Sequence, residues 1–162
     1  LFRDFRRWDL NHKELQLKLG EVVKATYRFN EDTIRLIDEW VAKIPFSDKY
    51  VAVHVRAGDK AIETDLFSPD IYMRELVKHT SLKNVFVFTD DYRNYQYLMD
   101  HYPDYSFFTF TDPEEHGYDQ AEVDGRDRDL CYRKYRIIKL FSNMEIMSNV
   151  LKPVLWKNNG NL

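Results

Sequence analysis

The residues best suited to chemistry stand together in the string HVRAGDK, where a hydrophobic run ends in charge. Its polar groups are His54, Arg56, Asp59 and Lys60, with Gly58 between them. Arginine offers a planar, permanently charged fork that binds two phosphate oxygens at once, and lysine adds a point charge. Glycine lets the backbone approach a ligand closely. The pattern therefore predicts an anion site, suited to a pyrophosphate whose charge grows as a bond to it breaks.

The same residues also allow a purely structural interpretation. Arg56 and Asp59 would then pair with each other, and His54 would be a half-buried histidine with its hydrogen bonds satisfied. The residue types by themselves leave both interpretations open.

The order of the expected elements puts this segment at one edge of a sheet. The expected helices are 30–43, 68–79, 92–101 and 129–148, and the expected strands are 50–56, 84–88, 105–110 and 150–156. Strict alternation of helices and strands is typical of parallel strands with helical crossovers. We therefore predict an α/β fold with a Rossmann-like parallel sheet flanked by helices. Ligands of such sheets bind at the carboxyl ends of the strands.

Local signals set the bounds of these elements. Asn30 is a candidate N-cap, and Ser68 precedes a proline at a first helical position. The strand 84–88 is apolar from Val85 to Phe88, which predicts burial on both faces. Asp129 is placed to cap the last helix. The polar segment 111–128 is long for a plain connection, which indicates a functional or mobile loop.

The last helix also carries an apolar stripe, which we expect to face the core. Its members are Ile137, Leu140 or Phe141, Met144 and Met147.

Composition excludes several classes of protein. The chain has 162 residues, enough for one domain with a proper core, and a net charge of -3, which argues against nucleic acid as a partner. Cys131 is the single cysteine, so an internal disulfide and a cysteine-based zinc site are excluded. No apolar run approaches the ~18 to 20 residues that span a bilayer. We expect a single α/β domain over 1–162, with 1–29 as an amino-terminal extension or remnant of a second domain and 30–162 as the core.

Four strings in order carry a family resemblance: VAVHVRAGDK, FSPDIYM, VFVFTDD and YPDYSF. Together they resemble the α1,6-fucosyltransferases and the related protein O-fucosyltransferases and nodulation fucosyltransferases. Those families share a strand ending His-x-Arg-x-x-Asp, a strand ending Thr-Asp-Asp and a Tyr-Pro-x-Tyr turn. The resemblance is good over 27–105 and looser to residue 148.

The resemblance implies a glycosyltransferase that uses a GDP-sugar, above all GDP-fucose, with inversion and without a metal or other cofactor. The sheet would be the donor-binding half of a GT-B scaffold. The implied partners are the nucleotide-sugar donor and a glycan or glycoprotein acceptor, with an additional domain or chain completing the site. Location would be the Golgi or ER lumen if the chain follows these relatives, and the cytoplasm if it is complete.

Site roles follow from the matching positions. Arg56 matches the essential arginine that binds the β-phosphate, and His54 matches a residue near the guanine end. Asp59 and Lys60 match residues that shape the donor pocket, where Gly58 would admit the backbone.

Two further sets of carboxylates match the families. Glu63, with Asp65 as the other option, is the candidate base that takes the acceptor proton. Asp90 and Asp91 match a pair that lines the donor site. N-capping of the next helix is the structural alternative for that pair, and both roles are compatible.

Three departures from the families support an alternative, a catalytically degenerate nucleotide-binding or scaffold domain of the same fold. The serine-rich turn that holds the β-phosphate is absent where the chain reads VLKPVLWKNN, and only about fifty residues precede the motif. The residues nearest to the acid that reads guanine are Asn143 and Glu145.

A metal-dependent nucleotide-sugar enzyme is a third, weaker hypothesis. The chain reads Asp-Arg-Asp at 127–129, the Asp-x-Asp pattern of metal-dependent glycosyltransferases, but without a preceding hydrophobic strand. Asp90 and Asp91 have the strand context for Mg²⁺, although neighbouring side chains on an extended backbone diverge.

Overall fold

The computed structural model describes residues 28–46, 49–57, 66–117, 125 and 128–148. The chain divides into two compact units, Leu1–Arg35 and Leu36–Leu162. Helix α2 (Glu31–Val41) begins in the first unit, where the Asn30 side chain accepts a hydrogen bond from the Thr33 amide at 2.8 Å. The predicted N-cap is therefore confirmed. That 1–29 is an amino-terminal extension or the remnant of a second domain stays a prediction, because nearly all of that segment lies outside the described residues.

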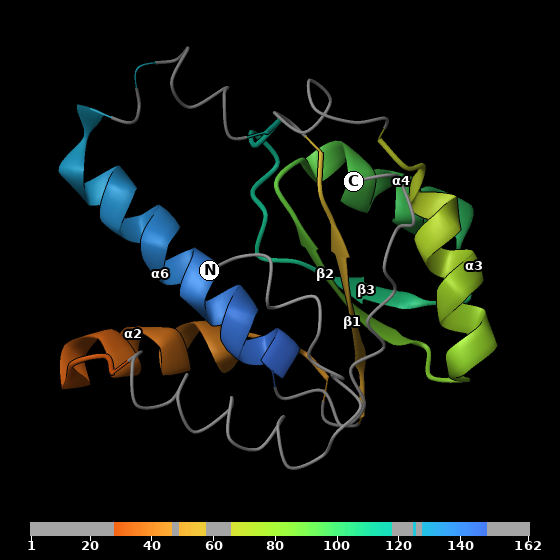
Figure 1. The fold of residues 1–162 in the computed structure, drawn as a ribbon, viewed down its shortest axis with the longest axis horizontal. Coiled ribbons are helices and arrows are strands. Elements are labelled where there is room, and N and C mark those ends of the chain that lie inside the picture. The colour runs from red at the N-terminus through yellow and green to blue at the C-terminus, as the bar shows by residue number, and fades with distance from the viewer. Residues whose placement is uncertain (1–27, 47–48, 58–65, 118–124, 126–127, 149–162) are drawn as a thin grey trace, which may run out of the picture. The chain divides into compact units, whose positions relative to one another are not determined.

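A parallel sheet forms the centre of the second unit. Its strands are β1 (Val51–Val55), β2 (Asn84–Thr89) and β3 (Ser106–Phe108), paired in the order β1-β2-β3. The helices after them are α3 (Pro69–His79), α4 (Tyr92–His101) and α6 (Leu130–Ser148). Figure 1 shows α3 and α4 together on one face of the sheet, with α6 on the other. The predicted Rossmann-like α/β arrangement is confirmed.

The alternating side chains of β1 explain the hydrophobic cluster between the sheet and helices α3 and α4. Val51, Val53 and Val55 project toward α3 and α4, as their period of two predicts. The fully or nearly buried members of this cluster are Val55, Met73, Leu76, Val85, Val87 and Leu98.

The opposite face of the sheet is largely aromatic. Phe86 and Phe110 meet edge to face with their ring centroids 5.2 Å apart, and Trp40 of α2 meets Phe110 at 4.9 Å. Ile146 of α6 packs into the same cluster and is completely buried. Because β2 contributes to both clusters, its predicted burial on two faces is confirmed.

Two predictions about the carboxyl-terminal part are wrong. Strand β3 ends at Phe108, two residues before the predicted end, although Phe110 is still buried. The predicted inward stripe of α6 is not inward, since Ile137, Leu140 and Met144 are exposed.

The helix instead buries Lys139, Ser142, Asn143 and Ile146. The physical reason is the loop after β3, whose carboxylates bind Lys139 and turn that face toward the sheet. The strand predicted at 150–156 lies outside the described residues. Among the helices of the described ranges, none combines the length and the apolar character needed to cross a membrane.

The core around α4 gives a direct test of the fold. Leu98 is fully buried between α4 and the sheet, so Leu98→Ala should lower the free energy of unfolding by about 2 to 5 kcal/mol. Val77→Ala on the exposed side of α3 should change it by less than about 0.5 kcal/mol. Urea unfolding followed by circular dichroism measures both. Equal effects of the two substitutions would contradict the assignment of the core.

Candidate functional site

The carboxyl ends of β1 and β2 lie side by side because the strands are parallel. Val55 pairs with Thr89, and just beyond that pair the Ala57 amide donates a hydrogen bond to Asp90 Oδ1 at 2.8 Å. The other oxygen, Asp90 Oδ2, is buried and accepts no hydrogen bond from the described residues. A buried carboxylate oxygen without a donor is unusual in folded proteins and marks Asp90 as a candidate site residue.

His54 projects from β1 on the side of the sheet that faces α6, and Arg56 directly follows the end of the strand. The His54 ring stacks on Phe88, with centroids 4.4 Å apart and planes 12° from parallel. Loss of solvation lowers the pKa of His54, the Asp90 carboxylate opposes this, and the Arg56 guanidinium adds to it. Although part of the ring is exposed, the surrounding protein therefore favours neutral imidazole, which can donate and accept a hydrogen bond.

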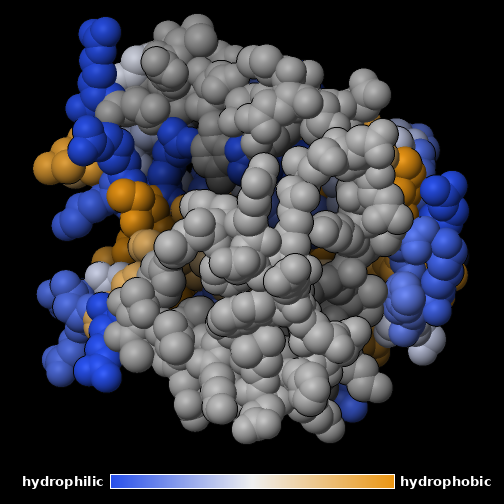
Figure 2. Space-filling view, viewed as in Figure 1, coloured by the Kyte–Doolittle hydropathy of each residue, from blue (hydrophilic) through white to orange (hydrophobic). Residues whose placement is uncertain are grey.

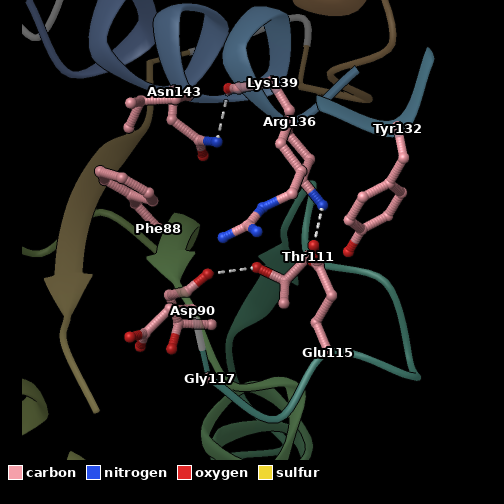
Figure 3. A pocket seen from close by; sticks show the side chains of 11 residues that line it. Phe88, Asp90, Thr111, Glu115, Gly117, Tyr132, Arg136, Lys139 and Asn143 are labelled. Carbon is pink, nitrogen blue, oxygen red and sulfur yellow. Dashed lines mark hydrogen bonds and ion pairs between the residues drawn. The ribbon is translucent and has the colours of Figure 1, made fainter. Parts of the chain in front are cut away.

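A hollow opens between the end of β2, the loop after β3 and α6. Its empty volume is about 490 Å³, a figure that includes the space open to solvent. The lining residues are Phe88, Thr89, Asp90, Thr111, Glu115, Gly117, Tyr132, Arg136, Lys139, Leu140 and Asn143. Figure 3 shows the side chains of Arg136 and Asn143 reaching from α6 toward Phe88 and Asp90.

His54 and Arg56 adjoin this hollow rather than line it. His54 reaches it through its stacking on Phe88, and the segment after Arg56 reaches it through the bond from Ala57 to Asp90. The end of β1 therefore lies beside a hollow whose lining includes the Asp90 carboxylate, the Asn143 amide and the Arg136 guanidinium.

Asn143 has a fixed orientation in the wall of the hollow. Its Nδ2 donates to the Lys139 carbonyl at 2.8 Å, one turn earlier in α6. Only the amide nitrogen can make this bond, so the amide oxygen remains as an acceptor on the buried side chain.

Lys139 ties α6 to the loop after β3. Its ammonium binds Glu115 Oε1 at 2.5 Å and Asp112 Oδ2 at 3.2 Å, and its side chain is almost fully buried. The Tyr135 hydroxyl donates to the same Asp112 oxygen at 2.7 Å, and burial together with this bond raises the pKa of Tyr135. A buried charge is tolerated only when it is paired, so this network fixes both the loop and the helix.

The same loop is also bonded to the end of β2. The Tyr92 amide donates to the Glu115 carbonyl and the Gly117 amide to the Asp90 carbonyl, both at 2.8 Å. Gly117 has φ 108°, a conformation that favours glycine. The backbone of Asp90 is thus held by the loop that forms the facing wall.

Asp91 has a structural role, as its N-capping alternative predicts. Its carboxylate accepts from the Arg93 amide at 3.0 Å and from the Arg93 guanidinium at 2.6 Å, and His116 Nδ1 lies 3.7 Å away. Burial raises the pKa of Asp91, but the bonds from Arg93 outweigh it and the net pKa is lowered. Asp91 is not among the residues that line the hollow.

The structure thus brings together three predicted site residues, His54, Arg56 and Asp90. The other predicted residues lie outside the described ranges: Gly58, Asp59, Lys60, Glu63 and Asp65. Asn143, one of two candidates from the resemblance, lines the hollow, whereas Glu145 is exposed and does not.

Sequence reasoning missed the part of α6 that faces the hollow. Tyr132, Arg136, Lys139 and Asn143 recur at spacings of four, three and four, which is one helical face. That polar stripe is visible in the sequence, but the apolar stripe on the same helix predicts a different inner face.

The Asp-x-Asp pattern is explained in part by capping. The Cys131 amide donates to Asp129 Oδ1 at 2.8 Å at the start of α6, while Asp127 lies outside the described residues. Among the residues that the structure describes, no three His, Cys, Asp or Glu side chains gather as a metal site.

Comparisons with known proteins add no family to this picture. No protein-family model matches the sequence, and no curated protein matches it significantly. The function must therefore be argued from the site and from the resemblance of its motifs.

The pH dependence of stability tests the environment of Asp91. Its pKa is lower in the folded chain than the value of about 3.9 expected after unfolding, so its charge stabilises the fold above that value. Asp91→Asn keeps a capping oxygen but loses the charge, and should cost about 1 kcal/mol at pH 7 because solvent screens the exposed Arg93.

This difference should shrink as the pH falls through the folded pKa of Asp91. Urea unfolding between pH 2 and pH 7 measures it, with Asp104→Asn on the exposed turn before β3 as the control. A difference that stays constant over this range would exclude the ionic role of Asp91.

Proposed function

We propose that the chain binds a GDP-sugar, with GDP-fucose as the expected donor, and transfers the sugar with inversion to a hydroxyl of a glycan or protein. The observation that carries the proposal is the meeting of His54, Arg56 and Asp90 at the carboxyl edge of β1 and β2. This is the edge at which parallel α/β sheets bind nucleotides. The fucosyltransferase resemblance assigns the β-phosphate to the same arginine.

Arg56 would bind the β-phosphate of the donor. As the glycosidic bond breaks, negative charge grows on the departing GDP, and a positioned guanidinium stabilises that charge more than it stabilises the ground state. Neutral His54 beside it offers a hydrogen bond without adding a second full charge.

The hollow supplies groups suited to the rest of the nucleotide. Phe88 presents an aromatic ring, the Asn143 oxygen accepts an N–H such as those of guanine, and Asp90 Oδ2 accepts from a sugar hydroxyl. Arg136 adds positive charge on the side of α6. These features support a nucleoside diphosphate as the ligand class.

Inversion needs a base on the acceptor side of the sugar. The acceptor hydroxyl attacks the anomeric carbon opposite the leaving phosphate, and the base removes its proton. The resemblance gives this role to Glu63, with Asp65 as the other option, both in the segment that follows Arg56.

Calorimetric titration with GDP tests the phosphate role. Arg56→Ala should weaken GDP binding roughly 10- to 100-fold, as expected for the loss of about 1.5 to 3 kcal/mol from a hydrogen bond to a charged group. Arg56→Lys should recover only part of the affinity, because lysine lacks the bidentate fork. Arg74→Ala on the exposed side of α3 removes the same charge elsewhere and should leave binding unchanged.

Equal GDP affinity in the wild type and Arg56→Ala would contradict the proposed phosphate contact. Transfer from GDP-fucose, compared between the wild type and a Glu63→Gln, Asp65→Asn double variant, separates the enzyme from its alternative. GDP binding with no transfer in either protein would favour the degenerate binding domain, for which the absent serine-rich turn is the sequence argument.

A further inference from the structure

An exposed apolar stripe runs along α6 beside its buried face, and one of its members, Leu140, also borders the hollow. Leu130 is 66% exposed, Ile137 51%, Leu140 37% and Met144 51%. Leu130, Ile137 and Met144 are seven residues apart, and Leu140 follows Ile137 by three. This is the spacing of the contact positions in a pair of coiled helices. Figure 2 shows hydrophobic side chains at the surface on the side where α6 lies.

Neither hydrophobic cluster of the described residues includes this stripe, although Leu140 also lies at the edge of the hollow. The buried face of α6 consists of Lys139, Ser142, Asn143 and Ile146, which contact the loop after β3, the hollow and the aromatic cluster. A helix whose polar face is turned inward by ion pairs leaves its hydrophobic face for another partner.

We infer that the stripe binds a second copy of this chain, through antiparallel pairing of the two α6 helices. Ile137 and Leu140 exchange places about a point midway between them. A two-fold axis through that point places Ile137 of one copy against Leu140 of the other, and the exposed Met144 beside the aliphatic stem of Arg133. The inference is independent of the proposed function.

Charge complementarity selects this partner and this orientation. Lys134 and Glu145 are eleven residues apart, close to three turns, and therefore lie on the same flank of the stripe. In an antiparallel pair the same flanks of the two helices meet, so Lys134 of each copy faces Glu145 of the other. Their positions differ by about two residues from perfect opposition, or about 3 Å, which a lysine side chain spans.

Parallel pairing would bring like charges together. Arg133 occupies a contact position of the heptad, so a parallel, in-register pair would place it against Arg133 of the other copy. Antiparallel pairing removes that repulsion and adds two opposite-charge contacts.

Sedimentation equilibrium of the full chain tests the pairing. The wild type should form a reversible dimer whose fraction rises with concentration over the micromolar range. Ile137→Glu with Met144→Glu should weaken dimerisation at least 100-fold. The control is Val77→Glu, which places one such charge on a similarly exposed apolar residue of α3 and should leave the dimer unchanged.

A charge exchange tests the orientation and leaves the stripe untouched. Lys134→Glu alone, and Glu145→Lys alone, should each weaken the dimer about 10-fold, and the two together in one chain should restore it. A wild type that stays monomeric at every concentration overturns the inference, as does a dimer that Ile137→Glu with Met144→Glu leaves intact. Failure of the double exchange to restore dimerisation overturns the antiparallel arrangement. Dimerisation of the charge-exchange variants tests the inference even if the stripe variant does not fold.

Discussion

The parallel pairing of β1 with β2 is the constraint on which the candidate site depends. Each residue pair from Val51 and Val85 to Val55 and Thr89 is in register, so both strands end at the same level. Arg56 and Asp90 follow those ends directly and belong to neighbouring strands. Without this register the bond from the Ala57 amide to Asp90 could not form, and the two charged groups would not adjoin one hollow. A one-residue slip would also turn His54 to the α3 side.

The second determinant is the ion network of Lys139, which sets the rotation of α6. Asp112 and Glu115 draw the ammonium inward, and Arg136 and Asn143 follow because they lie on the same face. The same rotation of α6 leaves Ile137 and Met144 exposed. The ion network of Lys139 thus shapes the wall of the hollow and leaves a hydrophobic surface outside it.

Much of this fold could be predicted from the sequence because its signals are local. The alternating valines of β1, the continuous apolar run of β2 and the caps at Asn30, Ser68 and Asp129 each depend on a few neighbouring residues. The rotation of α6 could not be predicted in the same way. Two stripes compete on that helix, and only the carboxylates of a loop more than twenty residues away decide between them.

The site, like the fold, could be predicted where it depends on local signals and could not where it depends on the rotation of α6. His54, Arg56 and Asp90 were found because they end hydrophobic runs, and parallel strands bring such ends together. Arg136 was missed because its place in the hollow follows from the rotation of α6. The resemblance to fucosyltransferases supplied the ligand class, which neither the strand pattern nor the geometry could name.

A crystal structure of the chain with GDP tests the central claim most directly. The account predicts the β-phosphate within hydrogen-bonding distance of the Arg56 guanidinium, with the nucleoside in the hollow beside Phe88 and Asn143. A diphosphate bound away from the carboxyl ends of β1 and β2, or a site that stays empty at millimolar GDP, would contradict it.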